Sequence, residues 1–161
     1  MLPYFLFTWS MWHLWRLSTR DTPFHELYQG VWIGRRLLTH EYPDTVKTIF
    51  DLTAEFPEIL AVREGRSYHA YPTLDATPLE AGTLYEAATR VLNADHDVFI
   101  HCANGYGRTG SLAAAVLLIS GKVNDVEEAI DYLTHRRPAL KLNDMQIASV
   151  QRFASALETT G

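Results

Sequence analysis

Residues 97–110 have the sequence Asp-Val-Phe-Ile-His-Cys-Ala-Asn-Gly-Tyr-Gly-Arg-Thr-Gly, from which the fold class can be inferred. Its apolar start, residues 98–100, predicts a buried strand that delivers Cys102 to its C-terminal end. Two glycines, at 105 and 107, allow the chain to curl tightly, and residues 108–120 predict the helix that follows. A strand, a glycine-rich loop and a helix in this order predict an α/β domain.

The curled loop has the properties of an anion-binding site that contains a nucleophile. Inward-pointing backbone N–H groups and the N-terminus of a helix both favour bound negative charge. The same field favours the thiolate of Cys102 over the thiol. Arg108 lies six residues later and can hold two phosphate oxygens with its planar guanidinium. Because Cys102 is the only cysteine, it can serve neither an internal disulfide nor a metal cluster.

The segment from His101 to Gly110 resembles the HCxxGxxR[S/T]G loop of the cysteine-dependent protein tyrosine and dual-specificity phosphatases. The resemblance runs from Tyr28 to Phe153 and includes the segments 31–34, 136–138 and 143–146. It implies a single α/β domain of the tyrosine phosphatase type, with a central, mostly parallel sheet of four or five strands flanked by helices. The chain also looks similar to bacterial membrane-associated dual-specificity phosphatase domains.

The resemblance implies a reaction through a phosphocysteine intermediate, which needs no metal or other cofactor. Cys102 would be the nucleophile, Arg108 would bind phosphate, and Thr109 would assist departure of the thiolate; Thr109 as a simple helix cap is the alternative. The family takes the proton for the leaving group from an aspartate on an upstream mobile loop. Asp75, in the loop 71–78 between a strand and a helix, fits that role best. The acids Glu80 and Asp95 are expected to be solvated or capping.

Other residues have expected supporting roles. The predicted phosphate-binding loop consists of Cys102, Ala103, Asn104, Gly105, Tyr106, Gly107 and Arg108. His101 is expected to shape this loop through hydrogen bonds, and Asn143 and Gln146 to support it or to order the hydrolytic water. Four arginines are expected either to line the rim of the pocket or to lie on the solvated surface: Arg63, Arg66, Arg136 and Arg137. The histidines show no paired metal-ligand spacing, so no metal site is predicted.

Hydrophobic patterning predicts the remaining elements. Strands are expected at 30–34, 47–52, 68–71 and 98–101, and helices at 79–93, 108–120, 124–135 and 144–158, with helices on both faces of the sheet. A length of 161 residues suits one domain. The net charge of −5 argues against a nucleic-acid partner, and the functional thiol favours the reducing cytoplasm.

The N-terminal segment, residues 1–20, is set apart from the catalytic domain, expected at 21–161, by its apolar composition. Residues 2–15 hold three of the four tryptophans. Three interpretations stay open: a helix docked on the domain, the end of a membrane segment or an interfacial anchor, and a disordered leader. The run is too short to cross a bilayer alone. If residues 1–17 contact a membrane, Arg16 and Arg20 place the domain on its cytoplasmic face.

The leading functional hypothesis is a dual-specificity or tyrosine protein phosphatase. The loop interior 103–107 lacks the lysines typical of family members that act on polyphosphorylated inositol lipids. The alternative is a lipid phosphate phosphatase, acting on phosphatidylglycerophosphate or a mono-phosphoinositide, which the apolar N-terminus would serve. A phosphate-binding pseudophosphatase is a minor alternative, because such proteins usually lose the cysteine, the arginine or the acid, and all three are present here.

Overall fold

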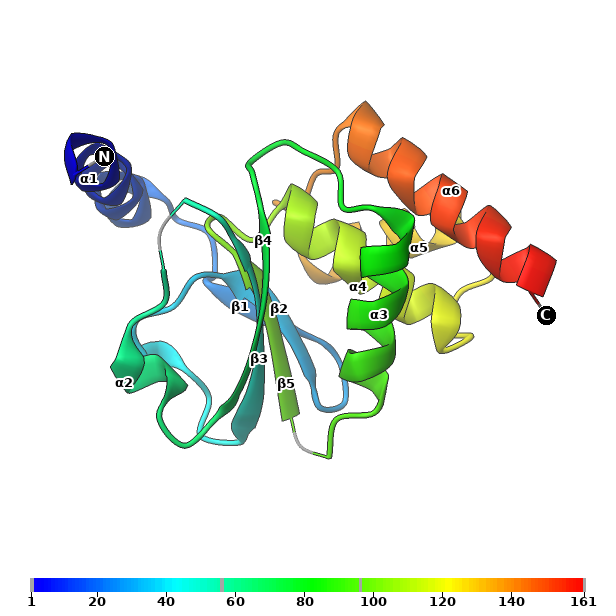
Figure 1. Ribbon diagram of the computed structural model, residues 1–161, viewed down its shortest axis with the longest axis horizontal. Helices are drawn as coiled ribbons and strands as arrows, with labels where there is room; N and C mark the ends of the chain where they lie inside the picture. The colour runs from blue at the N-terminus through cyan, green and yellow to red at the C-terminus, as the bar shows by residue number, and fades with distance from the viewer. Residues whose placement is uncertain (1, 56, 96, 161) are drawn as a thin grey trace.

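The computed structural model describes residues 2–55, 57–95 and 97–160 and is built around a five-stranded sheet (Figure 1). The strands are β1 (Phe24–Tyr28), β2 (Val31–Arg35), β3 (Val46–Thr53), β4 (Ser67–Thr73) and β5 (Asp97–Cys102). Their spatial order is β1-β2-β5-β3-β4; β1 is antiparallel to β2, and the other neighbouring pairs are parallel. The predicted α/β domain with a mostly parallel sheet is therefore confirmed.

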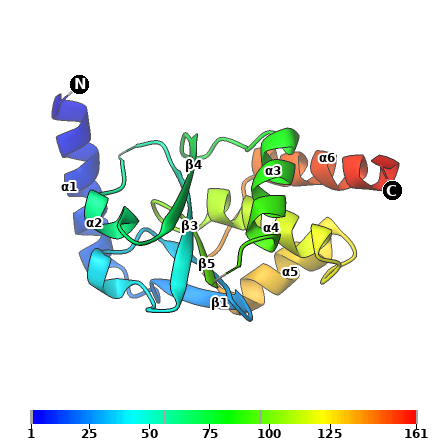
Figure 2. The ribbon, with the colours of Figure 1, turned by 60° about the horizontal axis from the view of Figure 1, so that its bottom comes forward.

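The helices cover the two faces of the sheet unevenly. They are α1 (Leu2–Ser18), α2 (Leu60–Arg63), α3 (Ala81–Leu92), α4 (Gly107–Ile119), α5 (Val126–Arg136) and α6 (Asp144–Thr160), with a 3-10 turn η1 (Thr39–Glu41). The helices α3 to α6 lie together on one side of the sheet, whereas α1 and the short α2 lie on the other (Figure 2). The expectation of helices on both faces is confirmed, and the larger core forms on the side of α3 to α6.

Strand β5 occupies the centre of the sheet and has both faces buried. Val98, Ile100 and Cys102 face the core shared with α3, α4, α5 and α6, while Phe99 packs in the smaller core on the opposite face. This two-sided burial explains why the strand is apolar without alternation. Because β5 lies between β2 and β3, its last residue, Cys102, emerges at the carboxyl edge of the sheet in the middle of the molecule.

Helix α4 is the most enclosed helix of the described chain, since every residue from Arg108 to Leu117 is buried. It contacts α3, α5 and α6 as well as β5, which follows from its nearly uniform apolar sequence. Its N-terminus therefore has a fixed direction relative to β5. The loop between β5 and α4 is held at both ends by the core.

Three elements of the fold were not predicted: the short turn η1, strand β1 and helix α2. Strand β1 is an edge strand with the sequence Phe-His-Glu-Leu-Tyr, in which only Leu27 is fully buried. Helix α2 has four residues, too few for a periodic pattern. Among the described residues, no helix has the length and apolar character needed to cross a membrane.

Candidate active site

The loop from Cys102 to Arg108 curls back on itself because glycine occupies its tightest position. Gly105 has a φ of +73°, and a Cβ atom there would lie 2.3 Å from the carbonyl carbon of Gly34 in β2. A Cβ atom on Gly107 would lie 2.3 Å from the side-chain oxygen of Gln146. The loop is thus pressed between β2 and the start of α6: only glycine fits at position 105, and a side chain at position 107 would displace that of Gln146.

The sulfur of Cys102 receives two hydrogen bonds at the floor of the loop. The backbone N–H of Gly105 donates to Sγ at 3.3 Å, and the hydroxyl of Thr109 donates at 3.2 Å. The thiol is buried, with 2% of the residue exposed. Two donors aimed at one sulfur, at the N-terminus of α4, stabilise negative charge on that atom. The predicted contact between Thr109 and Cys102 is therefore present in the geometry.

Arg108 is fully buried and is held by acidic partners. Its Nη1 donates to Glu55 Oε2 at 2.9 Å and to the carbonyl of Thr73 at 2.7 Å, and its Nη2 lies 2.9 Å from Glu55 Oε1 and 3.2 Å from Asp75 Oδ1. Burial acts to lower the pKa of Arg108, but the hydrogen bond with Glu55 and the charges of Cys102, Glu55 and Asp75 outweigh it, so the pKa is raised. Glu55 was not among the predicted residues.

Asp75 lies at the mouth of the loop, on the segment that follows β4. Its side chain is 70% exposed, and it borders a hollow of about 270 Å³ together with Cys102, Asn104 and Gly107. The next residue, Ala76, has a φ of +59°, a conformation that is strained for a residue with a side chain. Asn143 stabilises this turn, because its Nδ2 donates to the carbonyl of Ala76 at 2.8 Å.

Asn143 and Gln146 connect the Asp75 segment to the phosphate loop. The backbone N–H of each donates to the side-chain oxygen of the other, at 2.9 and 3.0 Å, so the two residues fix one another at the start of α6. Gln146 Nε2 also donates to the carbonyl of Thr77 at 3.4 Å, and both residues line the hollow above Cys102. The structure therefore brings this predicted pair into the site.

Three residues outside the predicted site hold the loop from behind. The backbone N–H of Arg36 donates to the Cys102 carbonyl at 2.9 Å, and the indole Nε1 of Trp12 donates to the Ala103 carbonyl at 2.9 Å. Arg137 donates from Nε to the Gly105 carbonyl at 3.0 Å. These bonds turn loop carbonyls outward. The expectation for Arg137 is corrected here: it is fully buried and lies behind the loop, on neither the rim nor the surface.

The other expected rim residues lie elsewhere. The guanidinium groups of Arg63 and Arg66 stack over the rings of Tyr68 and Tyr42, and that of Arg136 over Tyr132. None of these three arginines lines the hollow that contains Cys102. Glu80 and Asp95 are exposed and do not line it either, as expected for solvated acids.

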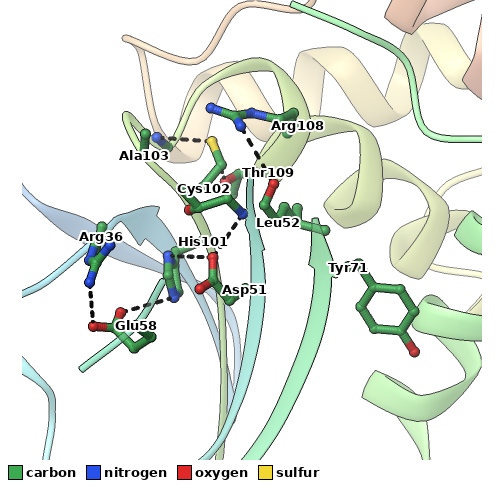
Figure 3. A network of polar contacts seen from close by, with 12 residues as sticks. Arg36, Asp51, Leu52, Glu58, Tyr71, His101, Cys102, Ala103, Arg108 and Thr109 are labelled. Atoms are coloured by element: carbon green, nitrogen blue, oxygen red, sulfur yellow. Dashed lines mark hydrogen bonds and ion pairs between the residues drawn. The ribbon is translucent and has the colours of Figure 1, made fainter. Parts of the chain in front are cut away.

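His101 faces away from the loop, into a buried polar network on the opposite face of β5 (Figure 3). Its Nδ1 lies 3.7 Å from Asp51 Oδ1 and its Nε2 lies 4.0 Å from Glu58 Oε2; Arg36 Nη2 donates to Glu58 at 2.8 Å. Tyr68 donates its hydroxyl to Asp51 at 2.5 Å. His101 was expected to shape the loop through hydrogen bonds. Its ring makes none to the loop, because side chains alternate between the two faces of β5 and this one lies on the other face.

The same network determines how Asp51 ionises. Burial acts to raise the pKa of Asp51, but the charge of His101 and the hydrogen bonds from Tyr68 and Thr53 outweigh it and lower the pKa. Asp51, Glu58 and His101 are also the one group of described residues with metal-ligand geometry, their ligand atoms lying within 4.8 Å of one another. Arg36 and Tyr68 already contact the two carboxylates, which is the arrangement of a buried ion-pair network.

Comparison with known proteins gives the family. The model of the dual specificity phosphatase catalytic domain matches residues 39–156. The chain belongs to this family. No curated protein sequence matches it significantly. The dual-specificity phosphatase domain is similar in fold to several solved structures, each of which it covers almost completely.

Three of these structures illustrate the similarity. Tk-PTP in its active form has 20% sequence identity and a TM-score of 0.75, with 83% of this chain and 97% of that chain covered. PTPMT1 has 17% identity and a TM-score of 0.76, with 85% and 97% covered, and was also solved in complex with PI(5)P. Human DUSP28 has 14% identity and a TM-score of 0.73, with 85% and 99% covered. At these identities the similarity establishes the fold of the dual-specificity phosphatase domain.

Proposed function

We propose that the chain is a cysteine-dependent phosphatase that hydrolyses phosphomonoesters through a phosphocysteine intermediate. The observation that carries the proposal is one hollow lined by a sulfur that accepts two hydrogen bonds and by a carboxyl group that contacts a buried arginine. Cys102 and Arg108 belong to one loop, Asp75 comes from the segment that follows β4, and Thr109 lies against the sulfur. Family membership supports the same chemistry.

In the first step, the thiolate of Cys102 attacks phosphorus and the P–O bond of the ester breaks in line with it. The N–H groups of the loop and the guanidinium of Arg108 bind the equatorial oxygens. Asp75 gives its proton to the departing oxygen, so the alcohol leaves neutral. A bound phosphate dianion supplies a new partner for the guanidinium of Arg108.

In the second step, the carboxylate of Asp75 takes a proton from water while the water oxygen attacks phosphorus and the P–S bond breaks. Thr109 donates its hydroxyl hydrogen bond to the departing thiolate, as its 3.2 Å contact with Sγ allows. Gln146 and Asn143 border the place where this water would lie. Inorganic phosphate is released, and Asp75 is protonated again for the next cycle.

Two substrate classes fit this reaction. The description of the family as dual specificity phosphatases supports phosphorylated tyrosine, serine or threonine side chains. A specific observation favours the second class, monophosphorylated lipids: the apolar helix α1 is attached to the phosphate loop through Trp12. PTPMT1, similar in fold, was solved with PI(5)P, a lipid of this class.

Steady-state hydrolysis of p-nitrophenyl phosphate tests the chemistry. We expect turnover by the wild type, loss of about 10⁴-fold or more in Cys102→Ser, and trapping of radioactive phosphate on the protein after acid quenching only when Cys102 is present. Asp75→Asn should slow alkyl phosphates about 100-fold and p-nitrophenyl phosphate much less, because p-nitrophenolate leaves without a proton.

The matched control is Asp95→Asn, an exposed acid away from the hollow. It should leave both rates unchanged. A wild type that binds phosphate without turnover would establish a pseudophosphatase instead. Equal effects of Asp75→Asn on both substrates would remove Asp75 from the role of proton donor.

A further inference from the structure

A second hollow adjoins the one that contains Cys102, and one side of it belongs to α1. It has a volume of about 290 Å³. The α1 side is formed by Phe7, Thr8, Met11, Trp12 and Trp15, and the opposite side by Glu55, Asp75, Ala103 and Asn104. Asp75 and Asn104 border both hollows. The apolar flank of α1 therefore begins where the catalytic hollow ends.

Helix α1 is held in this place by specific contacts. Trp12 is buried against Ala103 and Leu38, and its indole donates to the Ala103 carbonyl. Arg16 Nη2 donates to Glu41 at 2.6 Å, which also accepts the backbone N–H of Leu38. A buried aromatic anchor and a partly buried ion pair together fix the helix to the body of the domain.

The proposed reaction determines which part of a substrate contacts the α1 side of the hollow. The phosphate lies over Cys102, and the leaving oxygen must lie at Asp75, which protonates it. The organic part of the ester continues from that oxygen, and the hollow that Asp75 shares with α1 receives it. Phe7 and Met11 present their side chains on this flank. The α1 side of the hollow therefore favours substrates whose alcohol part is apolar.

The outer surface of α1 also favours a substrate with an apolar alcohol part. Of the eleven large apolar residues that are exposed among the described side chains, six lie on this helix: Leu6, Phe7, Trp9, Met11, Leu14 and Leu17. Extended peptides need partners for a backbone amide at every residue, which an apolar wall cannot supply. Acyl chains need none. Glu55 and Asp75 on the opposite side of the hollow repel a second anionic group close to the ester.

We propose that the hollow between α1 and the phosphate loop binds the acyl-bearing part of a lipid phosphomonoester whose phosphate is hydrolysed at Cys102. This inference rests on the proposed phosphatase activity and names its substrate class. Phe7 and Met11 are the specificity-determining side chains, and Trp12 positions the helix that carries them.

The test compares two double variants of the full chain. Phe7→Gln/Met11→Gln changes the wall of the hollow, whereas Leu14→Gln/Leu17→Gln makes the same kind of change on exposed positions of α1 outside it. Each protein is assayed with dihexanoyl phosphatidate below its micelle concentration, with glycerol 3-phosphate, with a phosphotyrosine peptide and with p-nitrophenyl phosphate. Because the lipid is monomeric, no membrane surface enters the measurement.

We expect the wild type to prefer dihexanoyl phosphatidate to glycerol 3-phosphate by about 100-fold in kcat/KM, from burial of the acyl carbons. In Phe7→Gln/Met11→Gln the ratio of kcat/KM for the lipid to that for p-nitrophenyl phosphate should fall about tenfold. Leu14→Gln/Leu17→Gln should keep the wild-type ratio.

Three results would overturn the inference while leaving the phosphatase activity intact. They are equal kcat/KM for the lipid and for glycerol 3-phosphate, an equal fall of the lipid ratio in both double variants, and a fall for the phosphotyrosine peptide as large as that for the lipid. Absence of p-nitrophenyl phosphate turnover by the wild type would contradict the proposed function itself.

Discussion

At the scale of single residues, the site is organised by paired opposite charges around Arg108. The guanidinium is buried, and Glu55 holds it with two oxygens at 2.9 Å, so its direction is fixed before a substrate arrives. A fixed guanidinium loses less rotational freedom on binding phosphate than a mobile one would. The exposed Asp75 contacts the guanidinium through a single oxygen at 3.2 Å and is the less firmly held of its two acidic partners.

The Asp51–His101 contact predicts a pH dependence of stability. Since the pKa of Asp51 is lowered in the folded state, its ionised form contributes stability that is fully present above the ordinary value of 3.8 and is lost as the pH falls through the folded value. Asp51→Asn should lower the free energy of unfolding at pH 7 by about 3 kcal/mol, because it removes one partner of a buried pair.

Urea denaturation at a series of pH values between 7 and 3 measures this effect. The difference between wild type and Asp51→Asn should shrink as the pH falls below 3.8. The exposed Asp44→Asn serves as the control and should change stability by less than about 0.5 kcal/mol at every pH. Parallel curves for wild type and Asp51→Asn across the acidic range would contradict the argument.

At the scale of elements, the loop between β5 and α4 depends on Gly105. An alanine there would need a left-handed conformation and would place its Cβ atom 2.3 Å from the backbone of β2. We expect Gly105→Ala to reduce kcat by about 100-fold or more, because the N–H that faces the sulfur is displaced. It should also lower the melting temperature, since the loop is pressed between β2 and α6.

Gly82→Ala in α3 is the matched control. Apart from its chain neighbours and the adjoining helix backbone, no atom lies within 4 Å of the added Cβ atom, and the position is helical. It should keep full activity and gain up to about 0.5–1 kcal/mol of stability from helix propensity. If Gly105→Ala retained wild-type kcat, the loop geometry would not govern the reaction.

The segment from β5 to α4 shows which parts of the fold and of the site could be predicted from the sequence. Residues 97–120 were sufficient to predict β5, the loop and α4, because a doubly buried strand and a fully buried helix both leave long apolar runs. Glu55 was missed, although a signal was present: acids follow the end of β3, a parallel neighbour of β5, and the carboxyl ends of such strands meet at one edge. The roles of Glu55 and Arg137 depend on contacts 53 and 32 residues away along the chain, which local patterns do not encode.

At the scale of the whole molecule, the two sides of the sheet differ in packing: one carries the larger core, the other the smaller core and α1. The helices α3 to α6 form a continuous core with the sheet, whereas α1 extends along the other side with its apolar surface outward (Figure 2). The active site lies between the two sides. Any change in the position of α1 therefore reaches the phosphate loop, which Trp12 contacts by its indole hydrogen bond and Trp15 by an edge-on ring contact with Tyr106.

Trp12→Phe isolates that connection. The phenyl ring can fill part of the indole site, but it has no N–H for the carbonyl of Ala103, so this loop carbonyl loses a partner. We expect a loss of about 1 kcal/mol in the free energy of unfolding and a fall in kcat of about fivefold. KM for p-nitrophenyl phosphate should change less than kcat, because loop N–H groups that are less well aligned weaken binding of the transition state more than of the ground state. Trp9→Phe is the matched control on the same helix, since Trp9 is 53% exposed and lies outside the hollow beside the loop. It should leave kcat unchanged. Steady-state kinetics well below the melting temperature of each variant separates the effects on rate and stability, and equal kcat values for the two variants would show that the hydrogen bond from Trp12 does not position the loop.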